Sequence, residues 1–117
     1  MEIYGKFVKI YMNNNIMVSV IVLTYNHELY VRQALDSILM QKTCFDFEII
    51  VGDDCSQDNT RKILKEYKAK YPHKIKLLLY KRNVGGTRNA HIIKTHTRGK
   101  YLAALEGDDY WNDEYKL

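Results

Sequence analysis

Three carboxylates lie within four residues at the end of a short apolar run, and these acids are Glu106, Asp108 and Asp109. An apolar run that stops abruptly at acidic residues predicts a buried strand whose end enters a cleft. Like charges packed this closely cost stability unless a cation compensates them. A hard divalent ion is a natural candidate, because Mg²⁺ takes one or two carboxylates and completes its shell with water and phosphate oxygens. The simpler alternative is an acidic loop in contact with solvent.

A second acidic pair, Asp53 and Asp54, follows another apolar run. A carboxylate such as that of Asp54, placed beside a cleft, can accept a hydrogen bond from an imide N–H such as that of uracil. The alternative is a turn that leads into a helix, and we expect Ser56 or Asp58 to cap that helix.

Two more polar segments follow apolar runs. Tyr25 could stack on a flat base or merely cap the sheet, and we expect the neighbouring Asn26 to make a turn hydrogen bond. Farther along, Gly85 and Gly86 precede a helix whose N-terminus would favour phosphate, and Arg88 could make a bidentate contact with a diphosphate. The alternative for that loop is an ordinary connection.

The hydrophobic pattern predicts the elements that must position these residues. Continuous apolar runs predict strands, and apolar residues at helical spacing predict the helices between them. The expected strands cover 18–23, 45–51, 75–80 and 101–105, and the expected helices cover 28–40, 58–71 and 86–98. This alternation predicts an α/β fold with a mostly parallel sheet and helices on both faces. Right-handed crossovers then place all four carboxyl ends, and the polar segments after them, on one edge of the sheet.

The composition fits one soluble domain of 117 residues with a net charge of +4. Residues 61–100 hold 13 of the 18 Lys and Arg but only one acid, Glu66. This basic segment is either a solvated surface or a site of attraction for polyphosphate, nucleic acid or an anionic membrane. The chain shows no apolar stretch of transmembrane length and no signal peptide, and Cys44 and Cys55 lack metal-type spacing. We therefore expect a cytoplasmic protein, with the inner membrane face as an alternative location.

Four ordered motifs carry a family resemblance. They are VSVIVLTYN from Val18, FEIIVGDDCSQDNT from Phe47, NVGG from Asn83 and GKYLAALEGDDYW from Gly99. Together they resemble family 2 glycosyltransferases of the GT-A fold, which contains a Rossmann-like nucleotide-binding half. The resemblance covers residues 17–117, which we expect to form the nucleotide-diphospho-sugar-binding domain, and leaves residues 1–16 as an N-terminal extension or leader.

The resemblance implies a role for each matching residue. Thr24 and Tyr25 would line the nucleoside pocket, and Asp54 would contact the base. Arg88 would lie near the nucleotide and Asp108 near the ribose. The expected metal ligand is Asp109, with Mg²⁺ or Mn²⁺ as cofactor. The reaction implied is metal-dependent transfer of a sugar from a nucleotide donor, UDP-sugar by the base contact, with inversion at the anomeric carbon.

This sequence departs from the family pattern at several places. Leu23 replaces a usual Pro, Glu106 replaces a usual Asp, and the loop at 83–89 is short. Because family members continue well beyond the acidic motif, the resemblance implies a truncated domain whose catalytic base lies beyond Leu117. The acceptor (saccharide, lipid-linked or protein) would bind there too. The alternatives are a sugar nucleotidyltransferase, whose glycine loop follows the first strand, and a non-catalytic basic module that binds nucleic acid or another partner. We expect no nucleic-acid partner.

Overall fold

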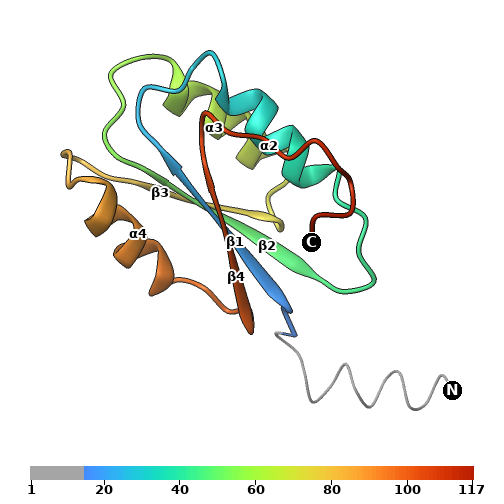
Figure 1. The fold of residues 1–117 in the computed structure, drawn as a ribbon. Coiled ribbons are helices and arrows are strands. Elements are labelled where there is room, and N and C mark those ends of the chain that lie inside the picture. The colour runs from blue at the N-terminus through green and yellow to red at the C-terminus, as the bar shows by residue number, and fades with distance from the viewer. Residues whose placement is uncertain (1–14) are drawn as a thin grey trace, which may run out of the picture.

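A four-stranded parallel sheet forms the centre of the molecule (Figure 1). The computed structural model describes residues 15–117, so most of the predicted extension at 1–16 lies outside the described residues. The strands, in the spatial order β3-β2-β1-β4, are β1 (Val18–Thr24), β2 (Phe47–Asp53), β3 (Ile75–Leu79) and β4 (Tyr101–Glu106). Every neighbouring pair is parallel. The predicted α/β fold with a parallel sheet is therefore confirmed.

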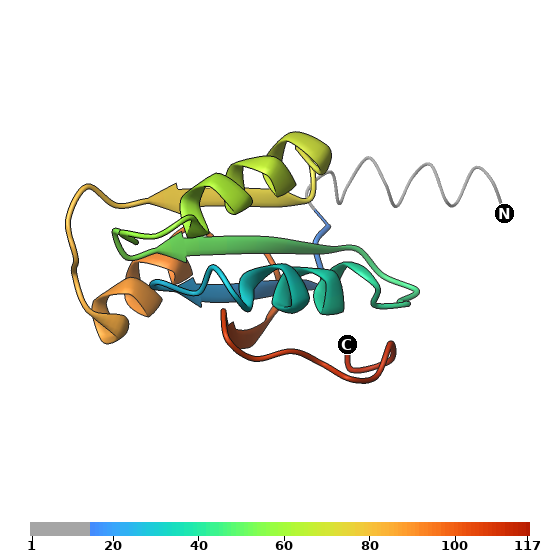
Figure 2. The same cartoon turned by 90° about the horizontal axis from the view of Figure 1, so that it is seen from above.

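Helices cover both faces of this sheet, as Figures 1 and 2 show. Helices α2 (Val31–Leu39) and α3 (Thr60–Lys70) cover one face, and α4 (Gly86–Lys94) covers the other. Alternate residues of the strands point to opposite faces, so that Ile49 belongs to the core under α2 and α3 while Ile50 packs with α4. Both side chains are fully buried, which explains why the strand reads as a continuous apolar run.

The element boundaries differ from the sequence predictions at the helix starts. The first helix begins at Val31 rather than at residue 28, because the backbone N–H groups of Tyr30 and Val31 both donate to the carbonyl of His27 in a turn. Asn59 occupies the cap position of the second helix without a side-chain cap bond, and Asp58 accepts from the backbone N–H of the first helical residue, Thr60, at 2.9 Å. Of the two predicted caps, Asp58 thus serves the helix start and Ser56 does not. The side chains of Ser56 and Asp58 also accept from backbone N–H groups of the turn after β1, so they join that turn to the turn after β2.

The segment after β4 folds back along α2 (Figure 1). Gln41 fastens it, since its side-chain amide donates to the carbonyl of Asp113 and accepts from the backbone N–H of Leu117. Trp111 packs against the core under α2 and α3. In contrast, Tyr101 and Leu102 at the start of β4 remain 65% and 46% exposed. No helix in residues 15–117 has the length and apolar character needed to cross a membrane.

The strand register brings the polar segments to one edge. Thr24 at the end of β1 pairs with Asp53 at the end of β2, and Leu23 pairs with Glu106 at the end of β4. Backbone hydrogen bonds continue past both ends, from Asp54 N to Thr24 O at 2.9 Å and from Gly107 N to Leu23 O at 2.8 Å. The carboxyl ends of β1, β2 and β4 therefore lie level, as the predicted topology requires.

Candidate functional site

A cavity of about 330 Å³ opens at this carboxyl edge. Its walls come from the ends of β1, β2 and β4 and from the loop into α4, with Thr24, Tyr25, Asp54, Gly85, Asn89 and Glu106 among the lining residues. These segments are distant in the sequence, so the cavity exists only because the parallel strands end together. Parallel α/β sheets bind their ligands at this position.

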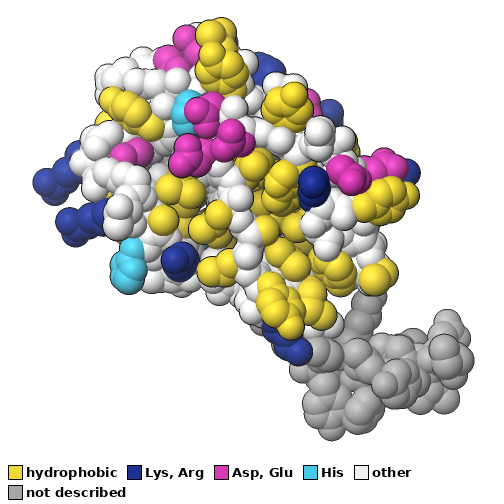
Figure 3. Space-filling view, viewed as in Figure 1, with side chains coloured by type: hydrophobic (Ala, Val, Ile, Leu, Met, Phe, Trp, Pro, Cys, Tyr) yellow, Lys and Arg dark blue, Asp and Glu magenta, His cyan; other side chains and the backbone are white. Residues whose placement is uncertain are grey.

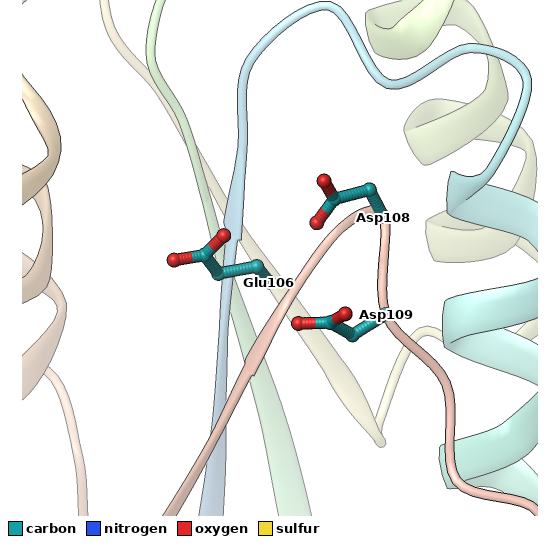
Figure 4. A group of neighbouring side chains, drawn as sticks. All are labelled: Glu106, Asp108 and Asp109. Carbon is teal, nitrogen blue, oxygen red and sulfur yellow. The ribbon is translucent and has the colours of Figure 1, made fainter.

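The acidic group lies beside the cavity, at the end of β4. A tight turn forms it, because the backbone N–H of Asp109 donates to the carbonyl of Glu106 at 2.9 Å. One carboxylate oxygen from each of Glu106, Asp108 and Asp109 lies within 4.8 Å of the others, and all three residues are exposed. Figure 4 shows the Asp108 and Asp109 carboxylates directed towards the side of the turn where Glu106 lies. Glu106 also lines the cavity, so the two features form one site.

Gly107 lets the turn sit directly on the end of β1. A Cβ atom at this position would lie 2.5 Å from Nδ1 of His27 and 2.9 Å from Cγ2 of Thr24. No side chain fits into that space without moving its neighbours. The close approach places the flanking acids, Glu106 and Asp108, beside the end of β1.

His27 also belongs to the site. It lines the cavity, and its Nε2 lies 4.0 Å from Oδ2 of Asp108. Its backbone N–H donates to the hydroxyl of Thr60, which ties the end of β1 to the start of α3. The sequence signal that could have identified His27 is its position, three residues beyond a strand that ends at the carboxyl edge of the sheet.

Asp53, the first acid after the β2 run, is a structural residue. Its carboxylate is fully buried and accepts from the Thr24 hydroxyl at 2.7 Å, from the backbone N–H of Ser56 at 3.0 Å and from Nε of Arg61 at 2.7 Å. Arg61 also donates to the carbonyl of Tyr80. Because the charge of Asp53 is paired inside the protein, it does not require a metal.

Asp54 holds the glycine loop in place. One carboxylate oxygen accepts from the backbone N–H of Val84 at 2.6 Å and the other from that of Gly85 at 3.0 Å. Gly85 has a φ of 88°, a conformation that favours glycine. Burial and the charge of Asp54 raise the pKa of the nearby Tyr80 above its ordinary value. Asp54 lines the cavity, and its predicted contact with a base stays a prediction.

The remaining predicted residues differ in how they meet the cavity. Thr24 is buried and its hydroxyl is already committed to Asp53, whereas the Tyr25 ring is 44% exposed beside the opening. Arg88 is exposed on the first turns of α4 and is not part of the cavity lining. Its neighbour Asn89 lines the cavity instead, with its amide donating to the carbonyl of Gly52 at 2.9 Å.

The acidic group fits a hard divalent cation by its chemistry. All three donors are carboxylate oxygens, the ligand type that Mg²⁺ and Mn²⁺ prefer. Within residues 15–117, the one basic side chain in ion-pair distance of these acids is His27. Figure 3 shows acidic side chains gathered on this surface of the molecule above a region of exposed hydrophobic side chains.

Comparison with known proteins settles the family. The sequence profile of the glycosyl transferase family 2 matches residues 19–117, nearly the whole described chain. The chain belongs to this family. The motif resemblance drawn from the sequence is thereby confirmed.

Two relatives show how much of a longer protein this chain corresponds to. It is 43% identical over 99 residues to an uncharacterized protein of Mycobacterium tuberculosis, an alignment that covers 85% of this chain and 29% of the relative. It is 37% identical over 100 residues to the poly(ribitol-phosphate) beta-N-acetylglucosaminyltransferase TarS of Staphylococcus aureus, with 82% of this chain and 17% of TarS covered. The chain thus spans less than a third of either relative.

The solved structures confirm the GT-A glycosyltransferase fold. Residues 1–349 of S. aureus TarS in complex with UDP superpose with a TM-score of 0.76 at 32% identity, covering 86% of this chain and 29% of that one. A mannosyltransferase of Pyrobaculum calidifontis, solved with GDP-Man and Mn²⁺, has the same TM-score of 0.76 at 23% identity, covering 86% of this chain and 30% of that one. The fold is therefore shared with structures at 32% and at 23% sequence identity.

Proposed function

We propose that this chain is the donor-binding part of a glycosyltransferase that transfers a sugar from a UDP-sugar to an acceptor hydroxyl, with UDP as the leaving group. One observation carries the proposal: Glu106 lines the cavity and also belongs to the three-carboxylate group. A nucleoside in the cavity would therefore place its diphosphate beside an ion held by the carboxylates. The named activity of TarS and its complex with UDP support this choice of donor.

The nucleoside contacts are assigned to the cavity wall. The exposed ring of Tyr25 offers a face for stacking on the base. Because the Thr24 hydroxyl is bound to Asp53, Thr24 would contribute shape rather than a hydrogen bond. Each Asp54 oxygen keeps a free lone pair after binding the glycine loop, and one of these could accept the imide N–H of uracil.

The phosphate and ribose contacts are assigned to the cavity rim. Asp109 would bind Mg²⁺ or Mn²⁺, with Glu106 beside it, and Asp108 would contact the ribose. The bound ion would offset negative charge that grows on the diphosphate as the sugar–phosphate bond breaks. Arg88 would turn from the surface of α4 towards the diphosphate.

The transfer step itself needs an acceptor. An acceptor oxygen would form a bond to the anomeric carbon while the bond from that carbon to the diphosphate oxygen breaks. A carboxylate base would take the acceptor proton, and this single displacement inverts the anomeric centre. We assign no residue of this chain as that base, and we place it beyond Leu117. The acceptor would be a saccharide, a lipid-linked molecule or a protein.

We also propose that the protein acts in the cytoplasm. The free cysteines Cys44 and Cys55 are compatible with a reducing compartment.

Calorimetric titration of the chain with UDP, with and without Mn²⁺, tests the proposed function. We expect binding that requires the metal, because the diphosphate and the carboxylates would otherwise repel each other. A single-stranded oligonucleotide titrated over a salt series tests the alternative, a basic nucleic-acid module. Steeply salt-dependent oligonucleotide binding without metal-dependent UDP binding would contradict the proposal.

Matched variants locate the site. We expect Asp109→Asn to abolish metal-dependent UDP binding and Asp46→Asn, an exposed acid in the turn before β2, to leave it unchanged. Asp54→Ala should weaken uridine binding more than pyrophosphate binding. If Asp109→Asn and Asp54→Ala both bind UDP and Mn²⁺ like the parent, the assignment of the site is wrong.

A further inference from the structure

A second and larger hollow, of about 570 Å³, lies at the opposite edge of the sheet. Its walls are the end of α3, the start of β3 and the connection from α4 to β4. These segments lie at the amino ends of the strands, whereas the proposed donor site lies at the carboxyl ends. A strand of seven residues such as β2 spans about 20 Å, so the two sites are well separated.

This amino-edge pocket is strongly basic. Its six basic lining residues are Lys68, His73, Lys74, Lys76, His96 and Arg98, and its one acidic lining residue is Glu48. The pocket therefore gathers four of the 13 Lys and Arg of the basic segment at 61–100.

Glu48 does not neutralise the lysines of this pocket. Its carboxylate accepts from the Ser19 hydroxyl at 2.6 Å, from the Arg98 backbone N–H at 2.7 Å and from Arg98 Nε at 3.0 Å. Burial raises the pKa of Glu48, but these hydrogen bonds and the charge of Arg98 outweigh it and lower the pKa below its usual value. Glu48 is thus an ionised partner that is already committed to Arg98.

Within residues 15–117, none of the three lysines forms an ion pair with an acid. The Lys68 ammonium donates to the carbonyls of Pro72 at 2.7 Å and Ile75 at 2.6 Å, which orient it but carry no net charge. The Lys74 ammonium lies 3.7 Å from the centre of the Phe47 ring, and burial lowers the pKa of Lys74 although the charge of Asp46 opposes that shift. Lys76 is exposed at the pocket wall. Such a cluster matches a ligand with two or more negative oxygens.

We propose that this pocket binds the phosphate head group of an anionic lipid and docks the protein on a membrane surface by its amino edge. Two features favour a lipid over free phosphate or nucleic acid. Tyr101 and Leu102 begin β4 at the same edge and are largely exposed, which suits insertion at a membrane interface. No Phe, Tyr or Trp lines the pocket, whereas proteins that bind single-stranded nucleic acid stack the bases on such large rings.

The orientation follows from the topology. With the amino edge on the membrane, the donor cavity at the carboxyl edge would face away from it, about one strand length into solution. The inference does not rest on the proposed transferase function, since vesicle binding needs neither UDP nor a divalent ion.

Co-sedimentation of the 117-residue chain with vesicles tests this inference. We expect binding to phosphatidylcholine vesicles that contain phosphatidylglycerol and none to pure phosphatidylcholine vesicles. Each lysine charge near an anionic surface contributes about a fivefold change in affinity. The double variant Lys74→Gln/Lys76→Gln should therefore bind roughly 25-fold more weakly. The matched control Lys62→Gln/Lys81→Gln removes the same charge from exposed residues outside the pocket and should bind like the parent.

Several results would overturn the docking inference. Equal losses in the two double variants would mean that net charge alone drives binding. Displacement from the vesicles by millimolar inorganic phosphate would identify a soluble anion as the occupant, and tighter binding of a single-stranded oligonucleotide would identify nucleic acid. Circular dichroism of both double variants checks that the fold is retained, and Tyr101→Ser offers a second test because it should weaken vesicle binding without altering the basic pocket.

Discussion

The two acidic strand ends look alike in the sequence but differ in the structure, in burial and in pairing. At the end of β2, Asp53 is fully buried and its carboxylate binds a hydroxyl, a backbone N–H and the guanidinium of Arg61. At the end of β4, the carboxylates of Glu106, Asp108 and Asp109 are exposed and gathered within 4.8 Å. The carboxylate of the first end is satisfied by protein groups, whereas the carboxylates of the second face solvent.

The difference shows where to look for function in an acidic motif. A buried carboxylate with its own cation stabilises the fold, and its removal harms the whole molecule. An exposed group of carboxylates held together by a tight turn costs stability and therefore needs another explanation. Asp54 stands between these two cases, since it holds the glycine loop and also lines the cavity.

The largest expected effect is on stability at the end of β2. Asp53→Ala leaves Arg61 without its partner and the Thr24 hydroxyl without its acceptor, so we expect a loss of at least about 3 kcal/mol in the free energy of unfolding. Asp109→Ala should change that energy by less than about 0.5 kcal/mol. Urea denaturation of both variants measures the contrast, and equal losses would remove the distinction between the two strand ends.

A smaller effect is expected at the turn after β4. Gly107→Ala places a Cβ atom 2.5 Å from the His27 ring, which we expect to cost about 2 kcal/mol through displacement of the turn. Because the turn carries the acids, Mn²⁺-dependent UDP binding should weaken as well. Gly86→Ala is the matched control for stability alone, since nothing lies within 4 Å of a Cβ atom at that position but Gly86 itself lines the cavity. An unchanged Gly107→Ala protein would show that the close contact does not position the acids.

Substitution of Tyr25 offers a test that affects ligand binding and leaves stability unchanged. Tyr25→Ala removes an exposed aromatic face, so we expect roughly tenfold weaker UDP binding from a loss of about 1–2 kcal/mol of stacking, with little change in stability. Titration calorimetry measures the affinity. Tyr30→Ala removes a ring of similar exposure outside the cavity and should bind UDP like the parent. Identical affinities for the Tyr25 and Tyr30 variants would exclude stacking by Tyr25.

The smallest expected effect concerns pH. The pKa of Glu48 lies below its ordinary value of 4.5, so its contribution to stability is complete above that value and is lost as the pH falls through the lower pKa of the folded state. The urea midpoint should therefore fall less between about pH 7 and pH 3.5 in Glu48→Gln than it does in the parent. If the parent and the variant lose the same stability on acidification, Glu48 is not the paired acid described here.

Most of the fold was predictable because its signals are local and consistent. The strands are continuous apolar runs that the parallel sheet buries on both faces, as Ile49 and Ile50 illustrate. Alternation of strands with amphipathic helices then predicted a parallel sheet with its carboxyl ends on one edge, although not the strand order, and that edge brings Thr24, Asp54 and Glu106 to a common cavity. The helix starts were less predictable, because Ser56 makes tertiary contacts instead of capping α3.

The parts of the site that were not predictable depend on long-range contacts. Nothing local marks Arg61 as the partner of Asp53, since a helical arginine is ordinarily a solvated residue. His27 enters the site only because the turn at Gly107 packs on it. Arg88 and Asn89 are adjacent in the sequence, yet the rotation of α4 turns Asn89 and not Arg88 into the cavity.

Paramagnetic broadening of amide resonances by Mn²⁺ tests the central claim most directly. With UDP present, substoichiometric Mn²⁺ should broaden the ¹H–¹⁵N signals around Glu106, Gly107 and Asp109 first, followed by those at the ends of β1 and β2. Asp109→Asn should abolish this pattern. Broadening centred on Asp53, or spread over the acids of the surface in both the parent and the variant, would contradict the account.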